Sequence, residues 1–140
     1  QINKKINSSI KSGLKIIFCI GETLMQRKKK LTNKILRKQI LKGINKIKNL
    51  NNILFAYEPI WSIGTGVIPK IHDLDKNINF IKNVLKNNFK IKNPKVLYGG
   101  SVNPKNVKNL ASIKSIDGFL VGGASQKAKN FIDIVKKTII

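Results

Sequence analysis

The sequence predicts an α/β fold with a parallel sheet, most consistent with a (β/α)8 barrel, and three observations lead to this prediction. Four short apolar runs, rich in β-branched and aromatic residues, are spaced along the 140 residues. Amphipathic helical patterns separate and follow these runs. Polar and glycine residues cluster directly after every run, which is where a (β/α)8 barrel carries its functional loops.

The four apolar runs have the composition of parallel strands that are buried on both faces. They are LKIIFCIG (14–21), ILFAYEP (53–59), KVLYGG (95–100) and DGFLVGG (117–123). A doubly wound sheet would also fit this alternation of strands and helices. That alternative concentrates its glycines in a GxGxxG motif after the first strand, and the sequence has no such motif. The barrel is therefore favoured.

Apolar residues at helical spacing predict helices between the strands and at the C-terminal end. These sets are Leu31, Ile35, Ile40, Ile44 and Ile47; Leu74, Ile78, Ile81 and Leu85; and Phe131, Ile134, Val135 and Ile139. We expect Asp73 to cap the second helix and Asn103-Pro104 to begin a further one. The opening residues 1–13 resemble the end of a helix that runs into a turn, so we expect the chain to begin inside a larger protein.

The net charge of +22 raises the possibility of nucleic-acid or membrane binding. The lysines are scattered, however, and Lys, Asn and Ile share A/T-rich codons, so a biased genome explains the charge without a partner. No aromatic-studded basic motif or apolar run of transmembrane length is present, so we expect neither nucleic-acid nor membrane binding. A single cysteine excludes an internal disulfide and fits a cytoplasmic location.

A lone carboxylate, Glu58, directly follows the second predicted strand, with Pro59 after it. A carboxylate in that place could accept a proton from a carbon acid or could be a salt-bridged structural group, and the residues alone leave both open. The next segment, WSIGTG (61–66), has an aromatic anchor and two glycines, which is typical of a lid that folds over a ligand and expels water.

Two glycine pairs follow the third and fourth predicted strands. Gly99 and Gly100 precede Ser101, and Gly122 and Gly123 lie just before a predicted helix. Each pair alone could be a tight turn. Backbone N–H groups at a helix start, unobstructed by side chains, bind phosphate well, so two such pairs after successive strands favour a phosphate site.

The segment AYEPIWSIGTG (56–66) closely resembles the signature of the triosephosphate isomerase family, AYEPVWAIGTG. CIGET (19–23), YGGSVNPKN (98–106) and DGFLVGGAS (117–125) are similar to other segments of that family, in the same order and spacing. The resemblance covers essentially the whole chain. It implies that residues 1–140 are the C-terminal half of one (β/α)8 TIM-barrel domain, with strands five to eight.

The resemblance also implies roles for individual residues. Glu58 would be the catalytic base that moves a proton between adjacent carbons of dihydroxyacetone phosphate and D-glyceraldehyde 3-phosphate, through an enediolate, without a metal or an organic cofactor. The residues implied to bind the substrate phosphate are Gly64, Ser101, Gly122 and Gly123. The lid and its hinge would comprise Pro59, Ile60, Trp61, Ser62, Ile63, Thr65 and Gly66.

Several departures from the family pattern limit what the chain could do alone. The family's catalytic histidine and its substrate-binding lysine and asparagine lie on earlier strands, and His72 is expected to be a surface residue beyond the lid. Lys30 replaces a glycine in an exposed loop, and Cys19 is expected to pack in the core. We therefore predict that the isolated chain is inactive, exposes unpaired strands and self-associates, while the full-length protein is a homodimer.

Three alternatives remain open at this point. The chain could be a product of gene decay or of a split gene, either inert or completed by a second chain. It could be a basic half-barrel that binds nucleic acid. A different phosphate-binding barrel enzyme is the third alternative, although it would leave the lid motif unexplained.

Overall fold

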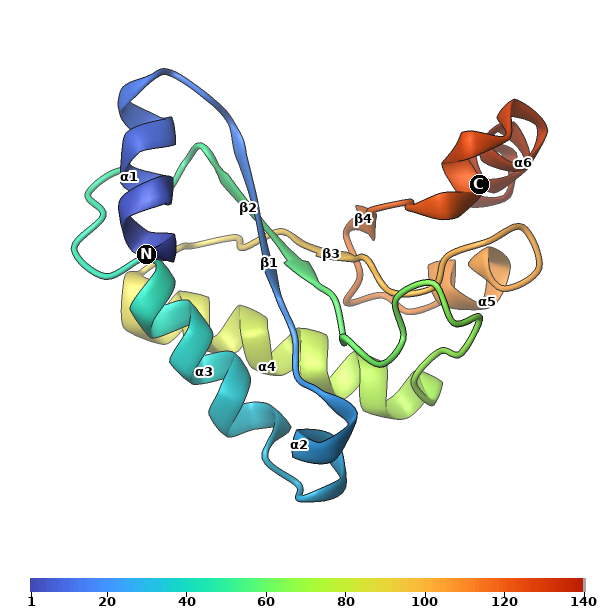
Figure 1. The fold of residues 1–140 in the computed structure, drawn as a ribbon, viewed down its shortest axis with the longest axis horizontal. Coiled ribbons are helices and arrows are strands. Elements are labelled where there is room, and N and C mark those ends of the chain that lie inside the picture. The colour runs from blue at the N-terminus through green and yellow to red at the C-terminus, as the bar shows by residue number, and fades with distance from the viewer. Residues whose placement is uncertain (140) are drawn as a thin grey trace.

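A computed structural model describes residues 1–139, and it contains one curved, four-stranded parallel sheet with helices packed against its outer side (Figure 1). The strands are β1 (Ile16–Ile20), β2 (Ile53–Tyr57), β3 (Val96–Tyr98) and β4 (Gly118–Phe119). Their order in the sheet is β1-β2-β3-β4, so each strand lies beside the next one in sequence. A parallel sheet in which neighbours follow chain order is the arrangement of a (β/α)8 barrel, and the predicted fold class is confirmed.

The helices largely follow the predicted apolar patterns. They are α1 (Ile2–Lys11), α2 (Leu24–Lys28), α3 (Thr32–Gly43), α4 (Ile71–Phe89), α5 (Val107–Ala111) and α6 (Ala128–Thr138), with a 3-10 helix η1 (Gly123–Gln126). Two predicted helix starts were wrong. Helix α4 begins at Ile71, so Asp73 lies in its first turn and pairs with Arg27 at 3.2 Å instead of capping the helix.

The other wrong start concerns the segment before α5. The side-chain oxygen of Asn103 accepts hydrogen bonds from the amides of Lys105 and Asn106, which holds residues 103–106 in a turn. Helix α5 begins at Val107, and Pro104 lies in the preceding turn instead of at the first helical position. The bonds that Asn103 accepts are those of an N-cap side chain, and its carbonyl also accepts the Val107 amide at 3.0 Å, so Asn103 caps the turn that leads into α5.

The core lies between the outer side of the sheet and helices α3 and α4. Alternate strand residues point toward these helices, among them Phe18 and Phe55, whose ring centroids lie 5.9 Å apart. Gly43 of α3 is necessary here, because a Cβ at this position would overlap the Phe18 ring. Each fully buried aliphatic side chain in this layer contributes roughly 1.5–3 kcal/mol of hydrophobic stabilisation.

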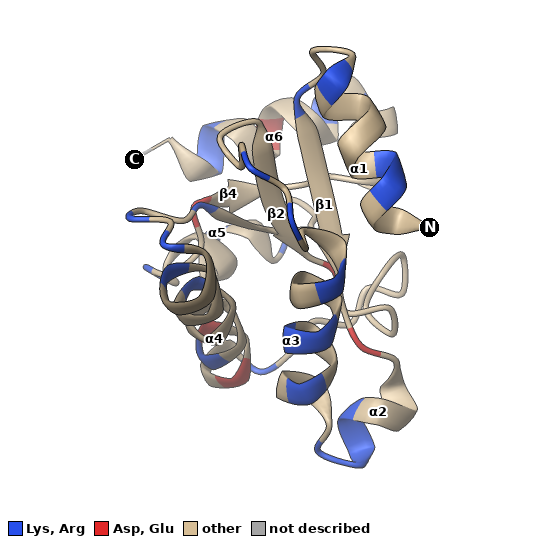
Figure 2. Ribbon diagram, turned by 90° about the vertical axis from the view of Figure 1, so that its left-hand side faces the viewer, with Lys and Arg blue, Asp and Glu red and all other residues tan. Residues whose placement is uncertain are grey.

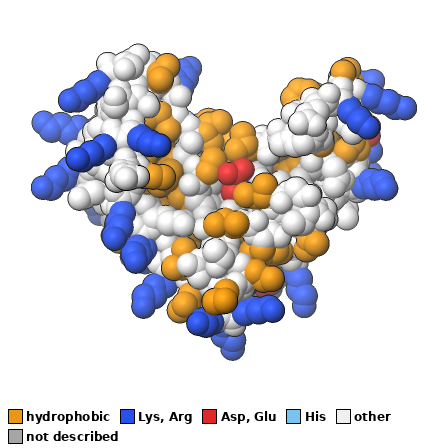
Figure 3. Space-filling model, in the orientation of Figure 1, with side chains coloured by type: hydrophobic (Ala, Val, Ile, Leu, Met, Phe, Trp, Pro, Cys, Tyr) orange, Lys and Arg blue, Asp and Glu red, His pale blue; other side chains and the backbone are white. Residues whose placement is uncertain are grey.

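The remaining strand residues point to the concave side of the sheet, which is open. Ile17 is 45% exposed and Leu54 is 43% exposed, and the Cys19 thiol is exposed beside them. The prediction that Cys19 packs in the core was therefore wrong for this chain, because the concave side has no covering layer within residues 1–139. Figure 3 shows the hollow, with hydrophobic side chains gathered between two arms of the molecule.

The distribution of basic residues over the surface bears on the prediction that the charge reflects no nucleic-acid partner. Lysine and arginine residues are distributed over several helices and loops and are not gathered in one stripe (Figure 2).

Lys30 lies in an exposed turn with a φ of 56°, a left-handed conformation that glycine adopts readily, which explains why glycine suits this position. In the part of the chain that the structure describes, no helix has the length and apolar character needed to cross a membrane.

Candidate active site

Glu58 lies at the carboxyl end of β2, at the edge of the sheet where all four strands end. Its amide donates a hydrogen bond to the carbonyl of Ile20 at 2.8 Å, which continues the β1–β2 pairing by one step. The side chain is half-buried. Successive side chains of a strand point to opposite faces, so Glu58 shares the concave face with Leu54 and Ala56. The strand therefore holds the carboxylate at the loop end of the sheet.

Two glycines create the space that Glu58 occupies. A Cβ at Gly21 would overlap the carbonyl oxygen of Glu58, so the ends of β1 and β2 approach closely only because position 21 has no side chain. A Cβ at Gly99 would lie 2.7 Å from both Cγ and Oε1 of Glu58. The glycine pair predicts space for a phosphate beside the backbone of Gly99. Instead, the space beside it is filled by the carboxylate of the candidate base.

Cys19 of β1 is a titratable neighbour of Glu58. The pKa of the Cys19 thiol is raised to about 12, first by loss of hydration and then by the hydrogen bond and the negative charge of Glu58. The thiol therefore keeps its proton at neutral pH and does not add a second negative charge next to the carboxylate.

The predicted lid leaves β2 as a series of turns. Pro59 and Ser62 are buried, whereas the tip is exposed, with Gly64 and Gly66 at φ angles of 70° and 79°. These left-handed values require glycine in practice. A Cβ at Gly64 or Gly66 would meet no atom within 4 Å, so the tip is not packed against the rest of the described chain.

The base of the lid is held by Glu22, a residue to which we had assigned no role. Glu22 is fully buried and accepts hydrogen bonds from the Tyr57 hydroxyl at 3.0 Å and from Trp61 Nε1 at 3.0 Å. Its backbone carbonyl accepts the amide of Ile60 at 3.0 Å. The guanidinium of Arg27 lies 4.4 Å from the centre of the Trp61 ring, on the outside of this cluster.

A sequence signal for Glu22 did exist. The chain contains only six acidic residues, and Glu22 follows a strand end just as Glu58 does. What the sequence could not reveal is that this carboxylate points into the lid base and not toward the concave side.

The residues expected to bind phosphate lie in the loops after β2, β3 and β4. Gly122 and Gly123 are exposed at the start of η1, and a Cβ at either position would meet nothing within 4 Å. Ser101 differs, because its amide donates a hydrogen bond to the Ser62 hydroxyl at 3.3 Å. The structure therefore brings Ser62 and Ser101 into contact. Open space lies next to the Cα atoms of Gly64, Gly122 and Gly123.

The structure also places the residues that we had expected to lie outside the site. His72 is exposed at the start of α4, as predicted. Among the described residues, no three His, Cys, Asp or Glu side chains come together as a group that could hold a metal ion.

Comparisons with known proteins agree with this architecture. The sequence profile of the family described as triosephosphate isomerase matches residues 1–138. The triosephosphate isomerase of Thermodesulfovibrio yellowstonii is 44% identical over 137 residues, which cover 96% of this chain and 56% of that protein. The enzyme of Geotalea uraniireducens is 45% identical over 140 residues, with coverage of 96% and 56%.

A more distant relative shows the same relation of lengths. The triosephosphate isomerase of Mycoplasma mobile is 38% identical over 135 residues, which cover 96% of this chain and 54% of that protein. The chain thus spans about half the length of the curated relatives it matches. Its parallel half-sheet and its match over nearly all its residues show that the chain belongs to the triosephosphate isomerase family.

Proposed function

We propose that this chain is the C-terminal half of a triosephosphate isomerase that interconverts dihydroxyacetone phosphate and D-glyceraldehyde 3-phosphate in glycolysis and gluconeogenesis. The observation that carries the proposal is the placement of Glu58. Its side chain lies over Gly99 at the carboxyl end of parallel strands, and the lid segment follows it without interruption.

In the proposed reaction the Glu58 carboxylate removes a proton from the substrate carbon beside the carbonyl group. The carbonyl oxygen takes up the charge as an enediolate forms, and the proton returns to the neighbouring carbon. This chemistry requires no metal or organic cofactor. Backbone amides at Gly64, Ser101, Gly122 and Gly123 would hold the phosphate, and closure of residues 59–66 would exclude water.

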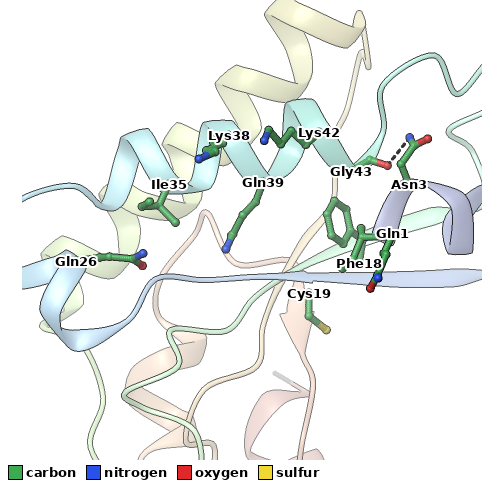
Figure 4. A pocket seen from close by; sticks show the side chains of 11 residues that line it. Gln1, Asn3, Phe18, Cys19, Gln26, Ile35, Lys38, Gln39, Lys42 and Gly43 are labelled. Atoms are coloured by element: carbon green, nitrogen blue, oxygen red, sulfur yellow. Dashed lines mark hydrogen bonds between the residues drawn. The ribbon is translucent and has the colours of Figure 1, made fainter.

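The isolated chain is proposed to be inactive and to need an N-terminal half, encoded either in the same chain or in a separate one. A groove of about 460 Å³ supports this part of the proposal, because it lies along the free edge of β1, between α1 and α3 (Figure 4). Within this groove the Gln39 side chain pairs with both the N–H and the C=O of Gly21, each at 2.9 Å. No strand within residues 1–139 pairs with this edge of β1, so the rest of the edge is available for another strand.

The partners proposed for the complete protein are a small phosphorylated triose and a second subunit in a homodimer, and its proposed location is the cytoplasm. The alternative of a nucleic-acid-binding half-barrel receives no support from the charge distribution, since the basic residues do not form one stripe (Figure 2).

Replacement of Glu58 by glutamine tests the proposed function. We define the complete protein as this chain together with the N-terminal half. In it, Glu58→Gln should lower kcat by roughly 10²–10⁴-fold, the usual contribution of a positioned general base. Asp133→Asn, which removes a carboxylate on the outer helix α6, should leave kcat unchanged and serves as the matched control. Near-normal turnover of the Glu58→Gln protein would refute the assignment.

A further inference from the structure

The Ser62 hydroxyl occupies an unusual place between the lid and the loop after β3. Ser62 is fully buried, although it lies in the lid segment between the exposed residues Ile60 and Ile63. The family signature that this segment resembles has alanine here, so the hydroxyl is a departure from the pattern. A buried hydroxyl needs hydrogen-bond partners, and their identity indicates what it does.

The hydrogen bonds of Ser62 can be assigned completely. Its Oγ lies 2.6 Å from the carbonyl oxygen of Val67, 3.1 Å from the Tyr98 hydroxyl and 3.3 Å from the amide nitrogen of Ser101. A serine hydroxyl has one proton and two lone pairs. The carbonyl of Val67 can only accept, so the proton goes to it, and Tyr98 and Ser101 both donate to Ser62.

The surrounding structure is shaped to permit this cluster. A Cβ at Gly100 would overlap the Tyr98 hydroxyl and would lie 2.7 Å from Ser62 Oγ, so only glycine leaves room for the pair. The amide of Ser62 donates to the carbonyl of Pro59 at 2.8 Å, and this turn fixes the backbone position from which the hydroxyl points inward. Burial raises the pKa of Tyr98, so its hydroxyl keeps the proton that it donates.

We propose that Ser62 is a positioning residue that holds the ligand-free lid and is displaced from Ser101 when phosphate binds. Its hydroxyl joins the lid to Val67, the residue directly after the lid, and to the loop that contains Ser101. This four-residue cluster of Ser62, Val67, Tyr98 and Ser101 is called the Ser62 latch below. The inference rests on the proposed function, in which the Ser101 amide binds the substrate phosphate.

The latch couples phosphate binding to lid release because one N–H group cannot be well aligned with two acceptors in different directions. A phosphate oxygen that takes the Ser101 amide removes one of the two bonds that Ser62 accepts. The contact between the lid base and the loop after β3 is then weakened at the moment when the lid must move. Replacing Ser62 with alanine should remove this competition.

The test compares wild type with Ser62→Ala in the complete protein, using inorganic phosphate as the probe. The chain's one tryptophan, Trp61, is adjacent to Ser62 and reports binding by its fluorescence. Ser62→Ala should bind phosphate about fivefold more tightly, the effect of one net hydrogen bond. Without phosphate, exchange of the Ser101 amide hydrogen, followed by NMR, should become about fivefold faster, because the amide has lost its hydrogen bond to Ser62.

Alanine is the residue of the family signature at this position, so the variant is expected to fold. Ser112→Ala, which removes an exposed hydroxyl bonded to the Asn109 carbonyl, is the matched control and should change neither quantity. If wild type binds phosphate and Ser62→Ala binds it equally or more weakly, the latch is refuted while the proposed isomerase function stands. If neither protein binds phosphate, the phosphate site and the latch are both refuted.

Discussion

Gly99 leaves room for the proposed catalytic base, because the Glu58 carboxylate occupies the space where a side chain at position 99 would lie. In the complete protein, Gly99→Ala should displace this flexible carboxylate without disturbing the backbone. We expect kcat to fall roughly 10²-fold, as for an ångström-scale misplacement of a reacting group, with little change in melting temperature. Steady-state kinetics and a thermal melt of the same sample measure both quantities.

Gly118→Ala provides the comparison for this variant. Its added Cβ would lie 3.1 Å from Leu97 Cδ2 and would not touch Glu58. Equal losses of kcat in the two variants, or a fall in melting temperature as large as the fall in activity, would show that Gly99 has a general packing role only.

Tyr57 is one of the groups that make the stability of the fold depend on alkaline pH. Burial, followed by the charge and hydrogen bond of Glu22, raises the pKa of Tyr57 well above its ordinary value of 10.0. Above pH 10, the ordinary pKa of tyrosine, the unfolded chain loses the Tyr57 proton while the folded chain keeps it. The free energy of unfolding should therefore fall by about 1.4 kcal/mol per pH unit from this group.

Urea unfolding of this chain between pH 9 and 11 checks that expectation. Tyr57→Phe should reduce the slope of unfolding free energy against pH. Tyr98 and Cys19, whose pKa values are also raised, should account for part of the slope that remains. An identical slope in the wild type and in Tyr57→Phe would contradict the assignment.

At the scale of elements, Asp117 joins the start of β4 to β3 and α4. Its carboxylate accepts hydrogen bonds from the Val96 amide at 2.8 Å and from Lys95 at 3.2 Å, and it pairs with Lys82 at 2.7 Å. Burial alone would raise the pKa of Asp117, but these partners outweigh burial and hold the pKa below 3.8. Three charge-assisted contacts thus attach the shortest strand to the sheet.

Asp117→Asn should therefore lower the free energy of unfolding at pH 7 by about 1.5–3 kcal/mol, the contribution of hydrogen bonds to a charged group. The stabilisation exists above the pKa of the unfolded carboxyl and is lost as the pH falls through the lower folded pKa, so the two proteins should converge in acid. Urea titrations at pH 7 and pH 3 measure the difference. A constant difference at both values would contradict the electrostatic explanation.

At the scale of the whole molecule, the described chain has two free sheet edges and an uncovered concave face. Strand β1 pairs only with β2 and β4 only with β3 within residues 1–139, and the apolar side chains of Ile17 and Leu54 are exposed between them. Exposed edges and apolar faces favour association. The chain alone should therefore self-associate, and the N-terminal half should convert it into a compact complex.

Sedimentation velocity of the chain with and without the N-terminal half measures this change. An N-terminal half from which the histidine-bearing segment has been deleted is the control, and its complex should remain inactive. A well-dispersed monomer of the chain alone would contradict the expectation.

The sequence pattern predicted best those elements whose apolar residues form a clear helical stripe or a continuous run. Helix α4 and strands β1 and β2 were evident because their apolar residues recur at helical spacing or form uninterrupted runs. The start of α4 was misassigned, and Asp73 pairs instead with Arg27, which lies 46 positions earlier in the sequence. Strand β4 is limited to two residues, Gly118 and Phe119, which pair with Leu97 and Tyr98 of β3.

The sequence by itself determined the family, the alternation of strands and helices, and the placement of Glu58 and the lid segment at strand ends. These properties depend on residue order and on motifs that are contiguous in the chain. Only the tertiary structure decided what surrounds them, namely that Gly99 makes room for Glu58, that Glu22 lies beneath the lid and that Ser62 engages the Ser101 amide. The reason is physical, since each of these contacts joins different strand ends, and parallel pairing alone determines which ends become neighbours.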